Sequence, residues 1–117
     1  SLTDYDVRIR EIHHTEKKDA PSGTAITLAE SILEDHPIKE RWVNTTNALK
    51  KELSILSERF PNVPGTHEIS YLSPVDQIEI KHTAHSREGF ASGALLAARW
   101  LIGKQGTFGM QDVLESL

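Results

Sequence analysis

The spacing of apolar residues changes from a strand period to a helix period between the first two segments of the chain. Of all the features of the sequence, this change most limits the folds that the chain can adopt. From Asp4 to His14 apolar residues alternate with polar ones, which is typical of a strand that buries one face. After a polar loop, apolar residues recur at helical spacing, at Ala25, Leu28, Ala29, Ile32 and Leu33. A half-buried strand followed at once by an amphipathic helix predicts a sheet with a helix on one face.

The later segments extend this pattern to an α+β fold. Further strands are predicted at Glu52–Arg59, Thr66–Leu72 and Gln77–Ala84. Further helices are predicted at Glu88–Ile102 and Met110–Leu117. We therefore expect a mixed or antiparallel sheet of four strands, with helices packed mainly on one face. In the first strand the alternation breaks at Glu11 and Ile12, which we interpret as an exchange of character between the two faces.

Composition and charge exclude several classes of protein. The 117 residues are one domain's length, and the absence of cysteine excludes disulfides and thiolate metal sites. A net charge of −4 argues against a dedicated nucleic-acid binder. No apolar stretch approaches the roughly 18 residues of a membrane span, and the first residues do not read as a signal peptide. We therefore expect a cytoplasmic protein that binds neither nucleic acid nor membranes.

Chemically useful side chains are concentrated between the first strand and the first helix. The strand ends in His13 and His14, the loop offers Lys17, and Ser22-Gly23-Thr24 opens the helix. Free N–H groups at a helix start attract anions, and a histidine can supply a proton near neutral pH. The segment therefore predicts a site that holds a carboxylate or phosphate beside an acid–base histidine, although most such helix starts bind nothing.

Other candidate sites are weaker. Arg87, between a strand and a helix, could grip a second carboxylate, but a lone arginine there is more often a surface residue. A zinc site ranks last, because adjacent histidines on a strand point to opposite faces and no His-Glu-x-x-His occurs. The glycines form neither Gly-x-Gly-x-x-Gly nor a Walker-type loop, so a dinucleotide would have to be bound outside this chain.

Two stretches resemble one enzyme family. The segment from Glu11 to Ala25, Glu-x-His-His-x-x-Lys-x-Asp-Ala-Pro-Ser-Gly-Thr-Ala, resembles the signature of the 4-hydroxy-tetrahydrodipicolinate reductases, also called dihydrodipicolinate reductases. The stretch from Gly65-Thr-His67-Glu through Ser86-Arg87 to Trp100-Leu resembles the C-terminal half of that family. These are NADH- or NADPH-dependent enzymes of lysine and diaminopimelate biosynthesis. The resemblance is weakest between Pro37 and Asn62.

The resemblance implies a domain organisation and an assembly. It implies a substrate-binding and oligomerisation domain over residues 1–89, and a helix and tail over 90–117 that return towards a nucleotide domain. That Rossmann domain, which would bind NADH or NADPH, is not in this chain. The family's C-terminal domain has a mixed four-stranded sheet, through which its members form tetramers.

The resemblance also implies roles for individual residues. His13 would be the general acid, with Lys17 helping that proton transfer or neutralising developing charge. His14 would line the pocket, Ser22, Gly23 and Thr24 would hold one carboxylate of a cyclic dicarboxylate substrate, and Arg87 is a candidate for the other. We expect the chain alone to be inactive, with no tightly bound cofactor and no metal. The alternative is a stand-alone dicarboxylate-binding module without catalysis.

Overall fold

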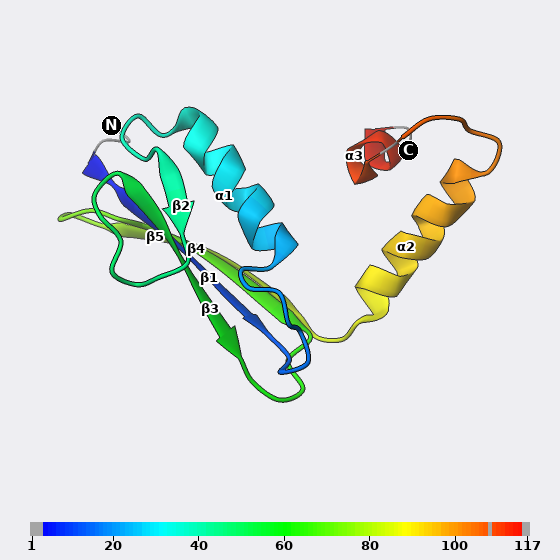
Figure 1. Cartoon of the computed structure of the whole chain (residues 1–117), viewed down its shortest axis with the longest axis horizontal. Helices are drawn as coiled ribbons and strands as arrows, with labels where there is room; N and C mark the ends of the chain where they lie inside the picture. The colour runs from blue at the N-terminus through cyan, green and yellow to red at the C-terminus, as the bar shows by residue number, and fades with distance from the viewer. Residues whose placement is uncertain (1–3, 108, 116–117) are drawn as a thin grey trace. The chain divides into compact units, whose positions relative to one another are not determined.

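The computed structural model describes residues 4–107 and 109–115, and the chain forms two compact units, Ser1–His85 and Ser86–Leu117. The first unit contains, in order, β1 (Asp6–His13), α1 (Gly23–Asp35), β2 (Arg41–Val43), β3 (Glu52–Arg59), β4 (Gly65–Leu72) and β5 (Gln77–Ala84). The second unit contains α2 (Glu88–Leu101) and α3 (Met110–Glu115) (Figure 1).

The sheet is mixed, and β1 lies at its centre. The strand order is β2-β3-β1-β4-β5. β1 pairs in parallel with β3 and antiparallel with β4, β2 runs parallel to β3, and β4 and β5 form an antiparallel hairpin. A parallel pair needs a crossover connection, and α1 supplies it between β1 and β3. The predicted α+β class is confirmed, but the strand count of four is wrong, because β2 also joins the sheet.

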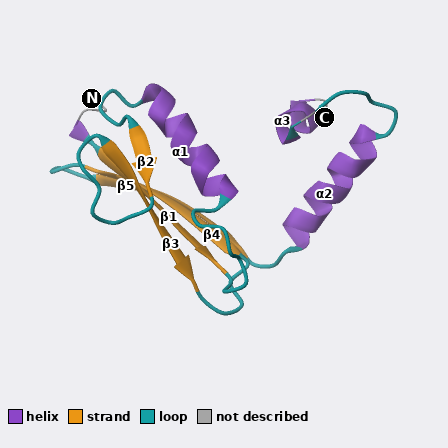
Figure 2. Ribbon diagram, in the orientation of Figure 1, coloured by secondary structure: helices purple, strands orange, loops and turns teal. Residues whose placement is uncertain are grey.

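Helix α1 covers one face of this sheet, and the core lies beneath it (Figure 2). Val7 and Ile9 of β1 and Leu53 and Ile55 of β3 are at most 1% exposed. They pack against the two small side chains at the centre of the predicted helical stripe, Ala25 and Ala29, which are also fully buried. Small residues at these positions let the helix lie close to the strands.

The opposite face of the sheet carries alternating charges across four strands. Glu58 of β3, Arg10 of β1, Glu68 of β4 and Lys81 of β5 form what we call the charge row. Arg10 lies 2.6 Å from Glu58 and 3.3 Å from Glu68, and Lys81 lies 3.3 Å from the other oxygen of Glu68. Because these side chains are partly exposed, each pair stabilises the monomer by less than about 1 kcal/mol.

The second unit is helical, as the sequence predicts. Helix α2 ends just before Gly103, whose φ of +81° is a left-handed conformation suited to glycine. Helix α3 buries Val113. The last two residues of the predicted helix Met110–Leu117 lie outside the described part of the chain. Among the described residues no helix is both long and apolar enough to span a membrane.

Candidate functional site

The buried face of β1 continues beyond its apolar residues into a polar pair. After Val7 and Ile9, the same face carries Glu11, which is 0% exposed, and His13, which is 8% exposed. The alternation therefore does not break at Glu11, and our interpretation that the two faces exchange there is wrong. Only the chemistry of the buried face changes. Burying a carboxylate costs several kcal/mol unless it is paired, so the partners of Glu11 define this region.

Four residues contact the carboxylate of Glu11. Arg59 is bidentate, with Nη1 2.6 Å from Oε1 and Nη2 3.0 Å from Oε2. The Ser57 hydroxyl and the Ser22 backbone N–H donate to Oε2 at 2.9 and 2.8 Å, and His13 Nδ1 lies 2.6 Å from Oε1. The register of the parallel pair explains this cluster, because β3 places Ser57 opposite Glu11 and Arg59 opposite His13.

These contacts keep Glu11 ionised. Burial alone would raise the pKa of its carboxyl group. The hydrogen bonds from Arg59, His13 and the Ser22 N–H outweigh burial and lower the pKa of Glu11 from 4.5 to about 2. At neutral pH the carboxylate is therefore a fixed anion that can only accept hydrogen bonds.

Arg59 also holds the loop that follows β1. Its Nε lies 3.3 Å from the carbonyl oxygen of Lys17, and its Nη2 lies 2.7 Å from that of Asp19. The Lys17 ammonium lies 3.2 Å from the Asp19 carboxylate, and the Ala20–Pro21 peptide bond is cis. One guanidinium thus ties the predicted site loop to the buried Glu11.

The start of α1 leaves two backbone N–H groups for a ligand. Ser22 is the N-cap, and its hydroxyl oxygen accepts from the N–H of Ala25 at 3.2 Å. Gly23 and Thr24 are exposed, and in the described part of the chain their N–H groups have no acceptor. A Cβ on Gly23 would meet no atom within 4 Å. Exposed N–H groups at the positive end of a helix dipole can bind an anion such as a carboxylate.

A second histidine, His67, packs against the ring of His13. His67 of β4 lies opposite Glu11 in the sheet, and its ring meets that of His13 edge-on, with centroids 5.1 Å apart. The Ser22 hydroxyl oxygen accepts from the Ala25 N–H and also lies within hydrogen-bond distance of His67, 3.2 Å from Nε2. Burial, and then the neighbouring His13, lower the pKa of His67, so this ring is neutral at pH 7.

Most predicted site residues share one connection in the fold. Those in or beside the connection from β1 to α1 are His13, His14, Lys17, Ser22, Gly23 and Thr24. Arg87, the seventh, is the N-cap of α2 in the second unit. Sequence reasoning gave Glu11, Ser57, Arg59 and His67 no role in substrate binding or catalysis. A charged residue on the apolar face of a strand was the available signal for Glu11, but its partners depend on the strand register.

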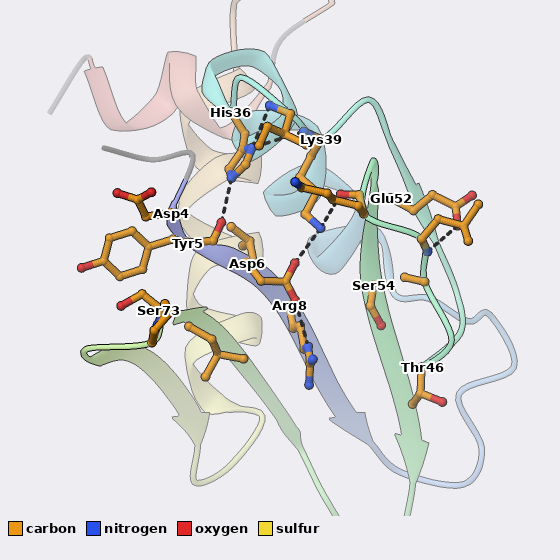
Figure 3. Close-up of a pocket in the computed structure, with 17 residues that line it drawn as sticks. Asp4, Tyr5, Asp6, Arg8, His36, Lys39, Thr46, Glu52, Ser54 and Ser73 are labelled. Carbon is orange, nitrogen blue, oxygen red and sulfur yellow. Dashed lines mark hydrogen bonds and ion pairs between the residues drawn. The ribbon is translucent and has the colours of Figure 1, made fainter.

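A cavity of about 500 Å³ lies at the opposite end of β1 (Figure 3). Its most buried charged group is paired within the chain. The Lys39 ammonium, on a side chain that is 4% exposed, lies 2.6 Å from Asp6 Oδ1 and donates to the carbonyl oxygen of Lys50 at 2.9 Å. His36 Nδ1 accepts the backbone N–H of Lys39. These bonds join the start of β1 to the segments after α1, so we interpret this end of the sheet as structural.

Comparison with known proteins identifies relatives of the whole chain. The sequence model of the family described as "Dihydrodipicolinate reductase, C-terminus" matches residues 1–114. A 4-hydroxy-tetrahydrodipicolinate reductase of Christiangramia forsetii is 53% identical over 116 residues, which cover 99% of this chain and 48% of that protein. One from Rickettsia bellii is 44% identical over 119 residues, with 99% and 47% covered.

A solved structure has the same fold. The dipicolinate-bound dihydrodipicolinate reductase from Paenisporosarcina sp. TG-14 matches with a TM-score of 0.63 and 25% identity, covering 97% of this chain and 42% of that one. The chain thus spans about half the length of the curated relatives it matches. With the family match covering almost every residue, the resemblance seen in the Glu11–Ala25 segment is confirmed. The chain belongs to the dihydrodipicolinate reductase C-terminal family.

Proposed function

We propose that this chain is the substrate-binding part of a 4-hydroxy-tetrahydrodipicolinate reductase. The supporting observation is the connection from β1 to α1, which combines a buried histidine, a lysine and a helix start with two exposed N–H groups. The two relatives that match 99% of this chain carry that enzyme's name. The reaction would take up a hydride and a proton and lose water, giving tetrahydrodipicolinate for lysine and diaminopimelate biosynthesis in the cytoplasm.

Each residue has a role set by its position. We propose that the N–H groups of Gly23 and Thr24 bind one substrate carboxylate. Ser22, which we predicted to bind it as well, uses its N–H for Glu11 and its hydroxyl oxygen for Ala25, so we revise its role to shaping the turn. His13 donates the proton, and Lys17 beside it supplies positive charge where negative charge develops. His14, half-buried at the end of β1, lines the pocket. Arg87 is our candidate for the second carboxylate, because a guanidinium can bind a carboxylate in bidentate fashion.

The hydride donor is NADH or NADPH, and the described residues do not fit it. The connection from β1 to α1 contains one glycine, Gly23, and lacks the Gly-x-Gly-x-x-Gly turn that lets a pyrophosphate approach a helix start. The nucleotide must therefore be bound by residues other than these. We accordingly expect no turnover by this chain alone. A dicarboxylate-binding module without catalysis would share the same anion site and is the competing function.

The binding site is tested by placing a methyl group on the helix start. In Gly23→Ala we expect the affinity for pyridine-2,6-dicarboxylate, measured by isothermal titration calorimetry, to fall about tenfold or more, because the new Cβ blocks approach to the N–H groups. The fold should tolerate it, since the Cβ meets no atom within 4 Å. Alanine should change the free energy of unfolding by no more than about 1 kcal/mol, in the stabilising direction.

Gly89→Ala is the matched control, because Gly89 lies at the start of α2 and a Cβ there also meets no atom within 4 Å. The affinity of the Gly89→Ala variant for pyridine-2,6-dicarboxylate should equal that of the unsubstituted chain. An equal affinity for Gly23→Ala would place the dicarboxylate elsewhere. No binding by the unsubstituted chain would count against the proposed function of this site.

We also propose that the chain forms a homo-oligomer, a tetramer in the family pattern, through the sheet face that carries the charge row. The row reads negative, positive, negative, positive from Glu58 to Lys81, so a copy related by a twofold axis presents the complementary order. We expect light scattering at micromolar concentration to give a mass well above the 13.1 kDa of one chain. A monomer under those conditions contradicts this proposal.

A further inference from the structure

The two ring nitrogens of His13 have different surroundings. Nδ1 lies 2.6 Å from Oε1 of Glu11, whose carboxylate is ionised and has no hydrogen to donate. Hydrogen bonding at this distance therefore requires that Nδ1 carry a hydrogen in the neutral ring as well as in the charged one. Nε2 is then the nitrogen that can gain or lose a proton.

The carboxylate that sets this tautomer is itself immobile. Glu11 Oε2 accepts from the Ser22 backbone N–H, from Ser57 and from Arg59, and Oε1 accepts from Arg59 and His13. Donors on both oxygens, drawn from three segments of the chain, prevent the carboxylate from turning. The edge-on contact with His67 bounds the ring of His13 on another side.

We propose that Glu11 is a positioning residue that holds His13 as the Nδ1–H tautomer, so that Nε2 is the atom that delivers the proton to the substrate. This inference rests on the proposed function, and it adds to it the reacting atom and the residue that selects that atom. In the step itself, the Nε2–H bond breaks, the proton goes to the substrate carbon beside the one that receives hydride, and a neutral ring remains. Glu11 keeps its negative charge throughout.

The donors around Glu11 also predict how the amide of an isosteric Glu11→Gln side chain would be oriented. In Glu11→Gln the amide must face one side with its NH₂ group. The Oε2 side receives two fixed donors, the Ser22 N–H and Arg59 Nη2, whereas the Oε1 side receives one fixed donor and His13. The NH₂ group therefore favours the side of His13, where the ring must accept at Nδ1 and carry its hydrogen on Nε2.

The test is ¹⁵N NMR of the imidazole rings in this chain, which reports which ring nitrogen of neutral His13 carries the hydrogen. We expect His13 to show a protonated Nδ1 and a bare Nε2, and expect the Glu11→Gln variant to shift towards the opposite tautomer. Calorimetry with pyridine-2,6-dicarboxylate should show that the variant still binds, within about tenfold of the unsubstituted chain. Glu52→Gln is the control, because Glu52 also accepts a backbone N–H and an arginine, at the far end of β3.

The results of these experiments decide whether Glu11 positions His13 or only stabilises the fold. A predominant Nε2–H tautomer in the unsubstituted chain overturns the inference without any variant. An unchanged tautomer in Glu11→Gln, or a variant that loses ligand binding along with its folded spectrum, shows that Glu11 is structural only. If the tautomer behaves as expected but the unsubstituted chain does not bind the dicarboxylate, the proposed function fails while the assignment of the tautomer to Glu11 stands.

Discussion

Replacing Arg59 with methionine should lower the free energy of unfolding by about 3–5 kcal/mol at neutral pH, because it leaves the carboxylate of Glu11 buried without its main partner. Glu11 is 0% exposed, and Arg59 contacts both of its oxygens. Methionine retains most of the volume of the arginine stem, so the loss reports the charge rather than a cavity. The same substitution also releases the carbonyl oxygens of Lys17 and Asp19, which frees the site loop.

This loss should depend on pH in a defined direction. The pKa of Glu11 is about 2 in the folded chain against an ordinary 4.5, so its ionised form stabilises the fold fully above about pH 4.5. That contribution disappears as the pH falls from about 4.5 towards 2. The difference between the unsubstituted chain and Arg59→Met should therefore be greatest at neutral pH and shrink on acidification.

Urea unfolding followed by tryptophan fluorescence measures this difference. A Trp100→Phe background leaves Trp42, which packs against the core of the first unit, as the reporter. Arg41→Met is the matched control, because Arg41 pairs with Glu52 at 3.0 Å but is 54% exposed. Its cost should stay below about 1 kcal/mol. Equal costs for the two variants at neutral pH would show that the Glu11–Arg59 pair is not a buried anchor.

The sequence predicted the long elements well, because their periodicity is local. Strand β3 has the predicted bounds, and the helical stripe from Ala25 to Leu33 packs on the core. Strand β2 escaped detection because three residues are too few to show alternation. It forms through pairing with β3, in a register that places Arg41 opposite Glu52. Such a strand depends on a partner eleven residues away, which a local pattern cannot indicate.

The candidate site likewise contains residues that a local pattern can predict and residues that it cannot. The motif that supplies His13, Lys17 and the helix start is continuous in sequence, so the resemblance located it directly. Glu11 appeared to break the strand because polarity was taken as exposure, whereas the structure buries it against an arginine 48 positions later. Pairing of that kind is visible only once β1 and β3 are in register. The residues of other strands that pair with Glu11 are therefore harder to predict than the residues of the continuous motif.

The largest effect on activity is expected at His13. Because we propose that the nucleotide is bound outside this chain, the test joins it behind the amino-terminal half of the Christiangramia forsetii relative, to which it is 53% identical over the matched region. In that chimera, His13→Gln should lower kcat by about 100- to 10,000-fold, the usual contribution of a general acid, while KM changes little. Lys17→Met should lower kcat/KM, and Lys18→Met, which removes the adjacent and exposed lysine, should not.

Calorimetry on the same substitutions then separates the two proposed functions. As a proton donor, His13 should matter far more for turnover than for the affinity of this chain for pyridine-2,6-dicarboxylate, because the proton moves only in the reaction. A parallel loss of binding and turnover in His13→Gln would instead assign His13 to ligand binding. A chimera that binds the dicarboxylate and the nicotinamide nucleotide but shows no turnover before any substitution would favour the binding module, because the proton donor and the anion site would then be present without catalysis.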